Sequence, residues 1–302
     1  MIVTLDIYSG RQNPSWRLST KDASRLLERV ADRAVAATEA SDGILGYRGF
    51  VVTATSDEEV PSGLPQAFRV GGGLMEGYSF ASAAKPLSEK ESFDAASFLL
   101  ETGVHTLEQG LVEYVTESLR SKPQTAKAVE AEWPEPAAAR EPADSEDAVA
   151  LAACVIANTP YNPGFWNTPT VQPKNNCYNY AMNYRSDTFA QPGRITGHMY
   201  SAINCSNVGN AATFDGCKTT CSGSNKLVAL VIAPGPGFVD YHWYRRHSEG
   251  FWGHKPGGTA ARNVDNSNLL INGTTRTPAN CNRGPYTIFC GYRYSPTGMH
   301  VS

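Results

Sequence analysis

The sequence predicts an α+β protein made of two domains joined by a linker. Three observations carry this prediction: helix and strand patterns over residues 1–120, a following stretch rich in Pro, Ala and Glu, and a C-terminal half that contains all seven cysteines. We place the linker at residues 121–147 and the second domain at residues 148–302. A chain of 302 residues is long enough for two ordinary domains.

The N-terminal domain is expected to combine short strands with two helices. Residues 1–8 alternate between apolar and polar side chains, as a half-buried strand does. A helix is predicted from about Thr20, and a long amphipathic helix is predicted to begin at the capping box of Ser88 and Glu91 and to reach Val115. The runs YRGFVVTAT and AFRV are typical of strands, and GGGLMEGYSF is typical of a glycine-rich turn that enters another strand.

The linker and the C-terminal domain differ sharply in composition. Residues 121–150 contain seven acidic residues and four prolines, and the prolines forbid a continuous helix. The stretch has too few large apolar residues to build a core, so a semi-stiff linker is expected. A helix capped by Ser145 is predicted in SEDAVALAACVIAN. Beyond it we expect one helix, beginning at Cys177, and four strands. These strands are KLVALVIAPG, VDYHWYRR, GFWGHK and YTIFCGYRY.

The charge distribution separates the two halves as well. Residues 1–150 carry 14 basic and 24 acidic side chains, a net charge of −10, whereas residues 151–302 carry 12 and 5, a net charge of +7. The basic half has no Lys/Arg-rich run with interleaved aromatic residues, so nucleic acid is not an expected partner. No apolar run approaches the ~20 residues of a membrane span. No secretory signal is expected either, because the N-terminus lacks a basic segment followed by an apolar one.

The seven cysteines leave the compartment open. Their odd number leaves at least one thiol unpaired, while six of them allow up to three disulfides, for example between Cys281 and Cys290. Disulfides suit an oxidising compartment, which would require export by a non-classical route, whereas the missing signal favours the cytoplasm, so the localisation stays unknown. A zinc site is the weaker alternative, because the spacing of its candidate ligands does not match a usual frame, and no cofactor is expected. These ligands are His198, Cys205, Cys217 and Cys221.

Cys177 is the candidate nucleophile. The run before it, YNPGFWNTPTVQPKNN, is too rich in Pro and Asn to be helical, and CYNYAMNYR after it is predicted to begin a helix. A helix N-terminus favours the reactive thiolate, and the Cys177 N–H would donate to a developing oxyanion. His242, in the predicted strand DYHWYRR, is the candidate base.

The strand pattern suggests how these side chains would meet. Alternation places His242 and Tyr244 on one face of their strand, and we expect that face to point toward the start of the Cys177 helix. A third group must orient the imidazole ring. The candidates are His254, which would lie beside His242 in a hairpin, and Asp265.

This order of a cysteine that opens a helix, a strand histidine, and a second histidine one hairpin later resembles the NlpC-type bacterial cell-wall endopeptidases of the papain-like superfamily. The resemblance covers roughly residues 145–295 and implies a helix packed on an antiparallel sheet. It also implies that Cys177 is the nucleophile, His242 the base and His254 the orienting third member.

The expected function is a thiol-dependent hydrolase that cleaves amide bonds in a peptide or in peptidoglycan stem peptides. Asn176, Tyr178, Trp243 and Tyr244 are the candidate substrate-binding residues. The acidic N-terminal domain would bind a protein partner. The alternative is a non-enzymatic, disulfide-stabilised module that binds glycan or protein through its tyrosines and tryptophans, as part of a secreted toxin or effector.

Overall fold

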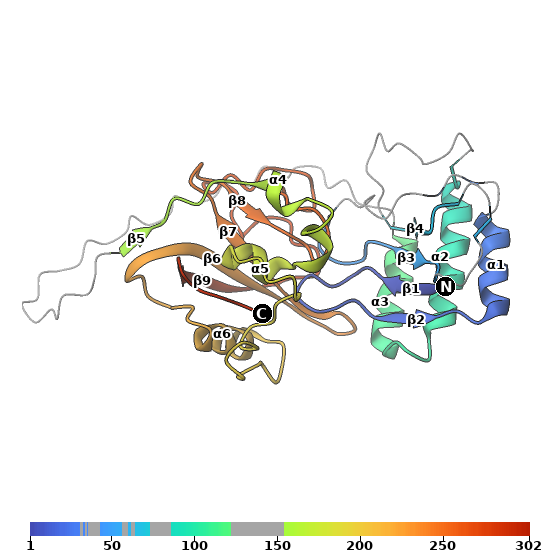
Figure 1. The fold of residues 1–302 in the computed structure, drawn as a ribbon, viewed down its shortest axis with the longest axis horizontal. Helices are drawn as coiled ribbons and strands as arrows, with labels where there is room; N and C mark the ends of the chain where they lie inside the picture. The colour runs from blue at the N-terminus through green and yellow to red at the C-terminus, as the bar shows by residue number, and fades with distance from the viewer. Residues whose placement is uncertain are drawn as a thin grey trace, which may run out of the picture.

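The computed structural model shows an N-terminal half and a C-terminal half that each combine a sheet with helices (Figure 1), and the predicted α+β class is confirmed. The described residues are 1–30, 33, 35, 43–55, 60–61, 64–72, 86–121 and 154–302. Residues 122–147 of the predicted linker lie outside them, as does the strand predicted at the end of GGGLMEGYSF.

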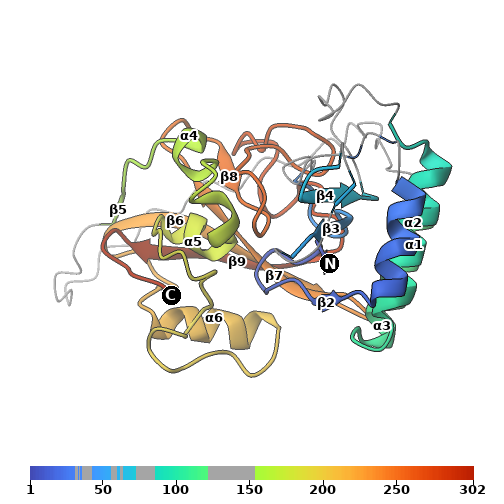
Figure 2. The same cartoon turned by 45° about the vertical axis from the view of Figure 1, so that its right-hand side comes forward.

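The described part of the N-terminal half is a four-stranded antiparallel sheet with three helices (Figure 2). The strand order is β2-β1-β3-β4. The strands are β1 (Ile2–Leu5), β2 (Ser15–Arg17), β3 (Phe50–Thr53) and β4 (Ala67–Val70), and the helices are α1 (Thr20–Val30), α2 (Glu89–Gly103) and α3 (Gln109–Arg120).

The capping box at the start of α2 is confirmed, but the long helix predicted from it is wrong. The Ser88 side chain accepts from the Glu91 N–H, and the Glu91 carboxylate accepts from the Ser88 N–H. The helix ends at Gly103, and α3 begins only at Gln109. Leu107 is buried within the intervening turn, so the apolar spacing continues across a break that periodicity alone does not reveal.

The N-terminal sheet has one core face and one polar face. Val3 and Val52 are fully buried in the core that the sheet shares with the helices. On the other face, Thr4 pairs with Val51, and Val51 pairs with Arg69, so that these three side chains form one row across β1, β3 and β4. This row forms part of the site described below.

The C-terminal half is built on a second sheet, with the order β5-β6-β7-β8 and with β9 paired to β6. Its strands are β5 (Cys154–Ile156), β6 (Gly223–Pro234), β7 (Val239–Arg246), β8 (Trp252–His254) and β9 (Ile288–Pro296). Its helices are α4 (Pro163–Trp166), α5 (Cys177–Met182) and α6 (Cys205–Phe214), with the 3-10 helix η1 (Gln172–Lys174) before α5.

Four strands and one helix of this half were predicted correctly, and the other elements were not. The strands β6, β7, β8 and β9 and the start of α5 agree with the sequence patterns. The described end of SEDAVALAACVIAN is not helical: it is β5, which pairs in parallel with the start of β6. The helices α4 and α6 were missed, and Asn162 and Asn204 cap their N-termini.

The two faces of the C-terminal sheet belong to different cores. Along β6, Leu230 and Ile232 pack with α5 and α6 in one cluster of buried side chains. Their neighbours Val231 and Ala233 point the other way and join the cluster that contains the N-terminal core. A side chain on this sheet therefore faces either the cluster with α5 and α6 or the cluster that includes the N-terminal core.

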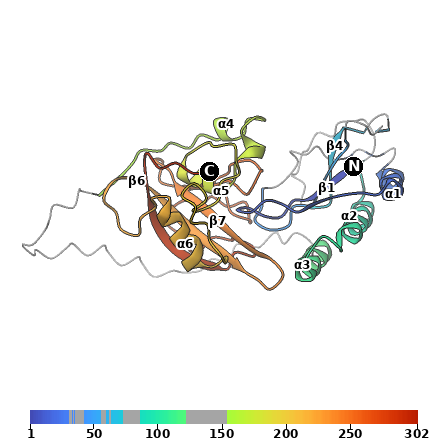
Figure 3. The ribbon, with the colours of Figure 1, turned by 60° about the horizontal axis from the view of Figure 1, so that its bottom comes forward.

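The two halves meet around the β6–β7 turn. Phe238 is 2% exposed, and its ring lies 5.6 Å from Tyr8, 4.9 Å from Tyr114 and 5.6 Å from Tyr286, measured between ring centroids. Gly237 in the same turn touches the main chain of α3, so closely that a side chain would collide there. The views show the long β6–β7 hairpin reaching the base of α3 (Figure 3).

Two disulfides close large loops of the C-terminal half. One joins Cys154 to Cys221, and the other joins Cys205, the first residue of α6, to Cys290 in β9. The suggested pair of Cys281 and Cys290 is therefore wrong, because Cys290 bonds Cys205 instead.

Candidate functional site

Cys177 is the first residue of α5, as predicted, but its thiol is sealed in the core. Asn176 caps the helix through its side chain, which accepts from the N–H groups of Tyr178 and Asn179. Cys177 is 0% exposed and packs in the cluster between α5 and the sheet. Burial raises the pKa of its thiol well above the usual range, so the neutral thiol rather than the thiolate is favoured.

The structure does not bring Cys177 and His242 together. On β7, Trp243 pairs with Leu230, and both lie in the same cluster as Cys177. His242 pairs with Val231, which lies in the cluster on the opposite face of the sheet. Because successive side chains of a strand point to opposite faces, His242 is directed away from α5. The expected orientation of the His242 face toward the Cys177 helix is therefore wrong.

His242 and His254 lie side by side across the β7–β8 hairpin, with 2.9 Å between His242 Nε2 and His254 Nδ1. His254 Nε2 lies 2.9 Å from the Val264 carbonyl oxygen, which can only accept. His254 therefore carries its proton on Nε2, and His242 donates from Nε2, so that its buried Nδ1 has no hydrogen-bond partner among the described residues. Burial lowers the pKa of both rings, that of His254 to about 3, so both are neutral.

Asp265 organises a turn rather than an imidazole. Its carboxylate accepts from the N–H groups of Ser267, Leu269 and Asn282 at 2.9–3.2 Å. The Arg276 guanidinium lies 3.5 Å from it. These contacts occupy the Asp265 carboxylate within its own loop.

The four predicted substrate-binding side chains are all buried. Tyr178, Trp243 and Tyr244 are each 0% exposed and belong to the cores, and Asn176 is buried as the N-cap of α5. The aromatic character that suggested a binding surface comes from core packing instead.

The N-terminal loop Ser9–Arg11 occupies the space beside the start of α5. The N–H groups of Ser9 and Gly10 donate to the Asp240 carboxylate at 2.6 and 3.2 Å. The Gly10 carbonyl accepts from Asn176, Gln191 and Tyr241. This main-chain segment is thus held by buried side chains of the C-terminal half.

The alternative zinc site is also wrong, because two of its four candidate ligands are consumed by the disulfides. Cys217 and Cys281 are buried free thiols, and burial raises the pKa of each to about 12. Within the described residues, none of the helices is both long and apolar enough to cross a membrane.

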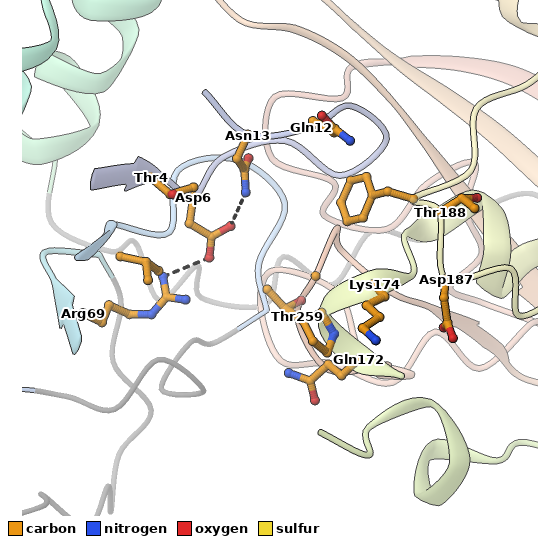
Figure 4. A pocket seen from close by; sticks show the side chains of 14 residues that line it. Thr4, Asp6, Gln12, Asn13, Arg69, Gln172, Lys174, Asp187, Thr188 and Thr259 are labelled. Atoms are coloured by element: carbon orange, nitrogen blue, oxygen red, sulfur yellow. Dashed lines mark hydrogen bonds and ion pairs between the residues drawn. The ribbon is translucent and has the colours of Figure 1, made fainter. Parts of the chain in front are cut away.

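A cleft of about 520 Å³ lies between the two halves (Figure 4). Sequence patterns did not indicate the cleft, because the described residues that line it are scattered from Thr4 to Thr259. We call its two sides the N-terminal wall and the C-terminal wall. The N-terminal wall consists of Thr4, Asp6, Gln12, Asn13, Val51 and Arg69, and the C-terminal wall of Gln172, Pro173, Lys174, Asp187, Thr188, Phe189, Gly258 and Thr259.

Asp6 and its two arginines fix the N-terminal wall. The Asp6 carboxylate contacts Arg48 at 2.7 Å and Arg69 at 2.9 Å, and the Asn13 amide donates to it at 3.1 Å. Burial alone would raise the pKa of Asp6, but the two guanidinium groups outweigh burial and lower it to about 2. The Asp6 carboxylate thus holds the Arg48 and Arg69 side chains in place at this wall.

Lys255 holds the C-terminal wall from behind. Its buried ammonium donates to the carbonyl oxygens of Gln172 at 2.6 Å, Gly257 at 2.7 Å and Asn175. These three acceptors match the three N–H donors of an ammonium group. Gln172 is the first residue of η1, Asn175 follows η1, and Gly257 precedes Gly258, so Lys255 fixes two of the segments that line the cleft.

Comparison with known proteins indicates a different identity from the predicted peptidase. No protein-family model matches the chain, and no solved structure matches it. Insoluble matrix shell protein 1 of Ruditapes philippinarum is 41% identical over 143 residues, which are 46% of this chain and 92% of the relative. The resemblance to bacterial NlpC-type hydrolases and cysteine peptidases is therefore wrong, because the relative that matches is a shell matrix protein. The chain belongs to the family of insoluble matrix shell protein 1.

Proposed function

We propose that this protein is a non-enzymatic, disulfide-stabilised module that binds glycan within an insoluble extracellular matrix. The observation that carries the proposal is the strand register, which directs His242 away from the buried Cys177 thiol. A thiol hydrolase needs a thiolate next to a base, and here the thiol is buried, its pKa is raised, and no imidazole faces it from β7.

Two further observations support a structural role. The disulfides Cys154–Cys221 and Cys205–Cys290 suit an oxidising, extracellular setting. The relative is described as an insoluble matrix shell protein, and a matrix component of that kind needs a durable fold and a surface that holds it to its neighbours. The cleft supplies such a surface, because ten of the described residues that line it carry hydrogen-bonding side chains.

The test is retention of the full chain on insoluble polysaccharide. Purified protein is sedimented with chitin beads and with cross-linked polygalacturonate beads, and uncharged agarose beads serve as the blank. We expect retention on at least one polysaccharide above the blank. Retention on neither would contradict the proposal.

A thiol measurement separates this proposal from catalysis. In native protein, Cys177 should react with iodoacetamide no faster than the buried Cys217, which lies in the same core cluster and serves as the matched control. Cys177→Ala and Cys217→Ala should both keep the retention of the unaltered chain. Rapid alkylation of Cys177, together with a peptide-cleaving activity that only Cys177→Ala removes, would show that the protein is an enzyme.

A further inference from the structure

We propose that the cleft between the two walls binds a short segment of a neutral polysaccharide, with one sugar ring against Phe189 and its hydroxyl groups bonded to uncharged side chains of both walls. This assignment rests on the proposed function and deepens it, because it names the site and the class of sugar. Neither the retention of the chain on a matrix nor its family fixes where a glycan binds.

The cleft combines the two kinds of surface that a sugar contacts. Its volume of about 520 Å³ lies within the range of ~300–1,000 Å³ typical of ligand sites. Val51, Pro173 and Phe189 provide apolar surface, and ten other described residues of the lining carry hydrogen-bonding side chains. A sugar ring has apolar C–H faces and hydroxyl groups around its edge, so it uses both kinds of surface at once.

Three uncharged polar side chains of the cleft have hydrogen-bonding groups to spare. Thr4 and Gln12 on the N-terminal wall and Gln172 on the C-terminal wall make no side-chain hydrogen bond within the described parts of the chain (Figure 4). Their hydroxyl and amide groups can both donate and accept. A sugar hydroxyl group also does both, so it can pair with any of the three.

The main chain that carries two of these side chains is held in place. Gln172 begins η1, and its carbonyl oxygen accepts from the buried Lys255 ammonium at 2.6 Å. Gln12 is followed by Asn13, whose amide donates to the Asp6 carboxylate at 3.1 Å. Because the backbone is already ordered at both positions, a ligand that binds there loses less affinity to the cost of ordering it.

Phe189 supplies an aromatic surface in an unusual backbone conformation. Its φ is 55°, a left-handed value that bulky residues seldom adopt and that often marks a functional position. The Phe189 N–H donates to the Lys174 carbonyl at 2.9 Å, and the Phe189 carbonyl accepts from the Gln191 amide at 3.0 Å. These bonds fix the position from which the ring projects, and the apolar face of a sugar packs well on such a ring.

The charged side chains of the cleft already interact with one another, which favours a neutral sugar over an acidic one. On the N-terminal wall, the Asp6 carboxylate contacts Arg69 at 2.9 Å. On the C-terminal wall, a hydrogen bond from Arg185 lowers the pKa of Asp187, and the charge of Lys174 acts in the same direction. A carboxylate or sulfate group on the ligand would be repelled by these two carboxylates, whereas a hydroxyl group would not.

Calorimetric titration of the full chain tests the assignment. The ligands are neutral chitotetraose, neutral cellotetraose and acidic tetragalacturonate. We expect at least one neutral ligand to bind ten times more tightly than tetragalacturonate. Its affinity should change less than twofold between low and high salt, because no ion pair forms. A smaller preference, a larger salt effect, or no binding of either neutral ligand would overturn the assignment.

Four variants locate the binding. Gln12→Ala and Gln172→Ala should each lower the affinity for the neutral ligand at least fivefold. Gln66→Ala, a matched change of an exposed glutamine outside the cleft lining, should alter it less than twofold. Phe189→Gly should weaken binding at least fivefold without lowering the melting temperature, because glycine accepts a φ of 55° freely. Unchanged binding by the three cleft variants would show that the ligand binds elsewhere.

The outcome also separates this inference from the proposed function. If the unaltered chain is retained on the beads and binds a neutral tetrasaccharide that the cleft variants lose, both proposals stand. If the chain is retained only on polygalacturonate, or if the cleft variants still bind the neutral tetrasaccharide, only the cleft assignment fails. If the unaltered chain binds neither beads nor oligosaccharides, the proposed function fails with it.

Discussion

Removing the Cys205–Cys290 disulfide should lower the stability of the chain by several kcal/mol. The bond closes a loop with a sequence separation of 85 and fastens the first turn of α6 to β9. Loop-closure entropy gives about 4.6 kcal/mol for a loop of this length, and about 4.4 kcal/mol for the separation of 67 between Cys154 and Cys221. With a urea m-value of about 3 kcal/mol/M, loss of one disulfide should lower the unfolding midpoint by about 1.5 M.

The assay is urea unfolding, followed by tryptophan fluorescence, of the unaltered chain and of two double variants. These are Cys205→Ser with Cys290→Ser, and Cys154→Ser with Cys221→Ser. Dithiothreitol should destabilise the unaltered chain by more than it destabilises either double variant. A variant that lacks all four of these cysteines should not respond to dithiothreitol. The reasoning is refuted if both double variants unfold at the midpoint of the unaltered chain and the reductant changes nothing.

Three other perturbations probe the contacts that hold the halves and the cleft. Folding lowers the pKa of Asp6 from 3.8 to about 2, so its ionised carboxylate should add about 2.4 kcal/mol to the free energy of unfolding above pH 4. This contribution should disappear as the pH falls toward 2. Acid titration of stability should show this loss, and Asp6→Asn should flatten it; an equally steep loss in the variant would be evidence against the linkage. Gly10→Ala should cost about 1–3 kcal/mol, since its Cβ would collide with the buried Tyr241 ring, and calorimetry would show the lower melting temperature. Tyr286→Phe deletes a 2.6 Å hydrogen bond to the buried Asp240 and should cost about 1.5–3 kcal/mol in urea unfolding, an expectation that an unchanged midpoint would contradict.

Local sequence patterns predicted most strands of the C-terminal half correctly, but they did not predict how these elements pack together. The alternation in VDYHWYRR fixed which side chains share a face of β7, and the spacing to GFWGHK placed His254 beside His242. Nothing in the alternation says which face receives α5. That choice is made by the apolar surface that Trp243 and its neighbours offer to the helix, and it directs His242 to the other side.

Other features depend on contacts that are distant in sequence. The segment Cys154–Ile156 looked helical, yet it becomes β5 because the start of β6 offers it parallel hydrogen bonds and Cys221 fixes its first residue. The cleft escaped prediction for the same reason. Thr4 and Lys174 have no local feature in common, and only the packing of the halves places them in one cavity.

The contacts of the Ser9–Arg11 loop determine what would happen if the chain were produced as two separate fragments. If the first residues were absent, the buried Asp240 carboxyl group would lose hydrogen-bond donors, and Asn176 and Gln191 would lose an acceptor. A C-terminal fragment produced alone would therefore be short of partners, and an N-terminal fragment added in trans should restore them. The protein is thus a candidate for a split reporter, whose two pieces recombine through main-chain recognition without a covalent connection.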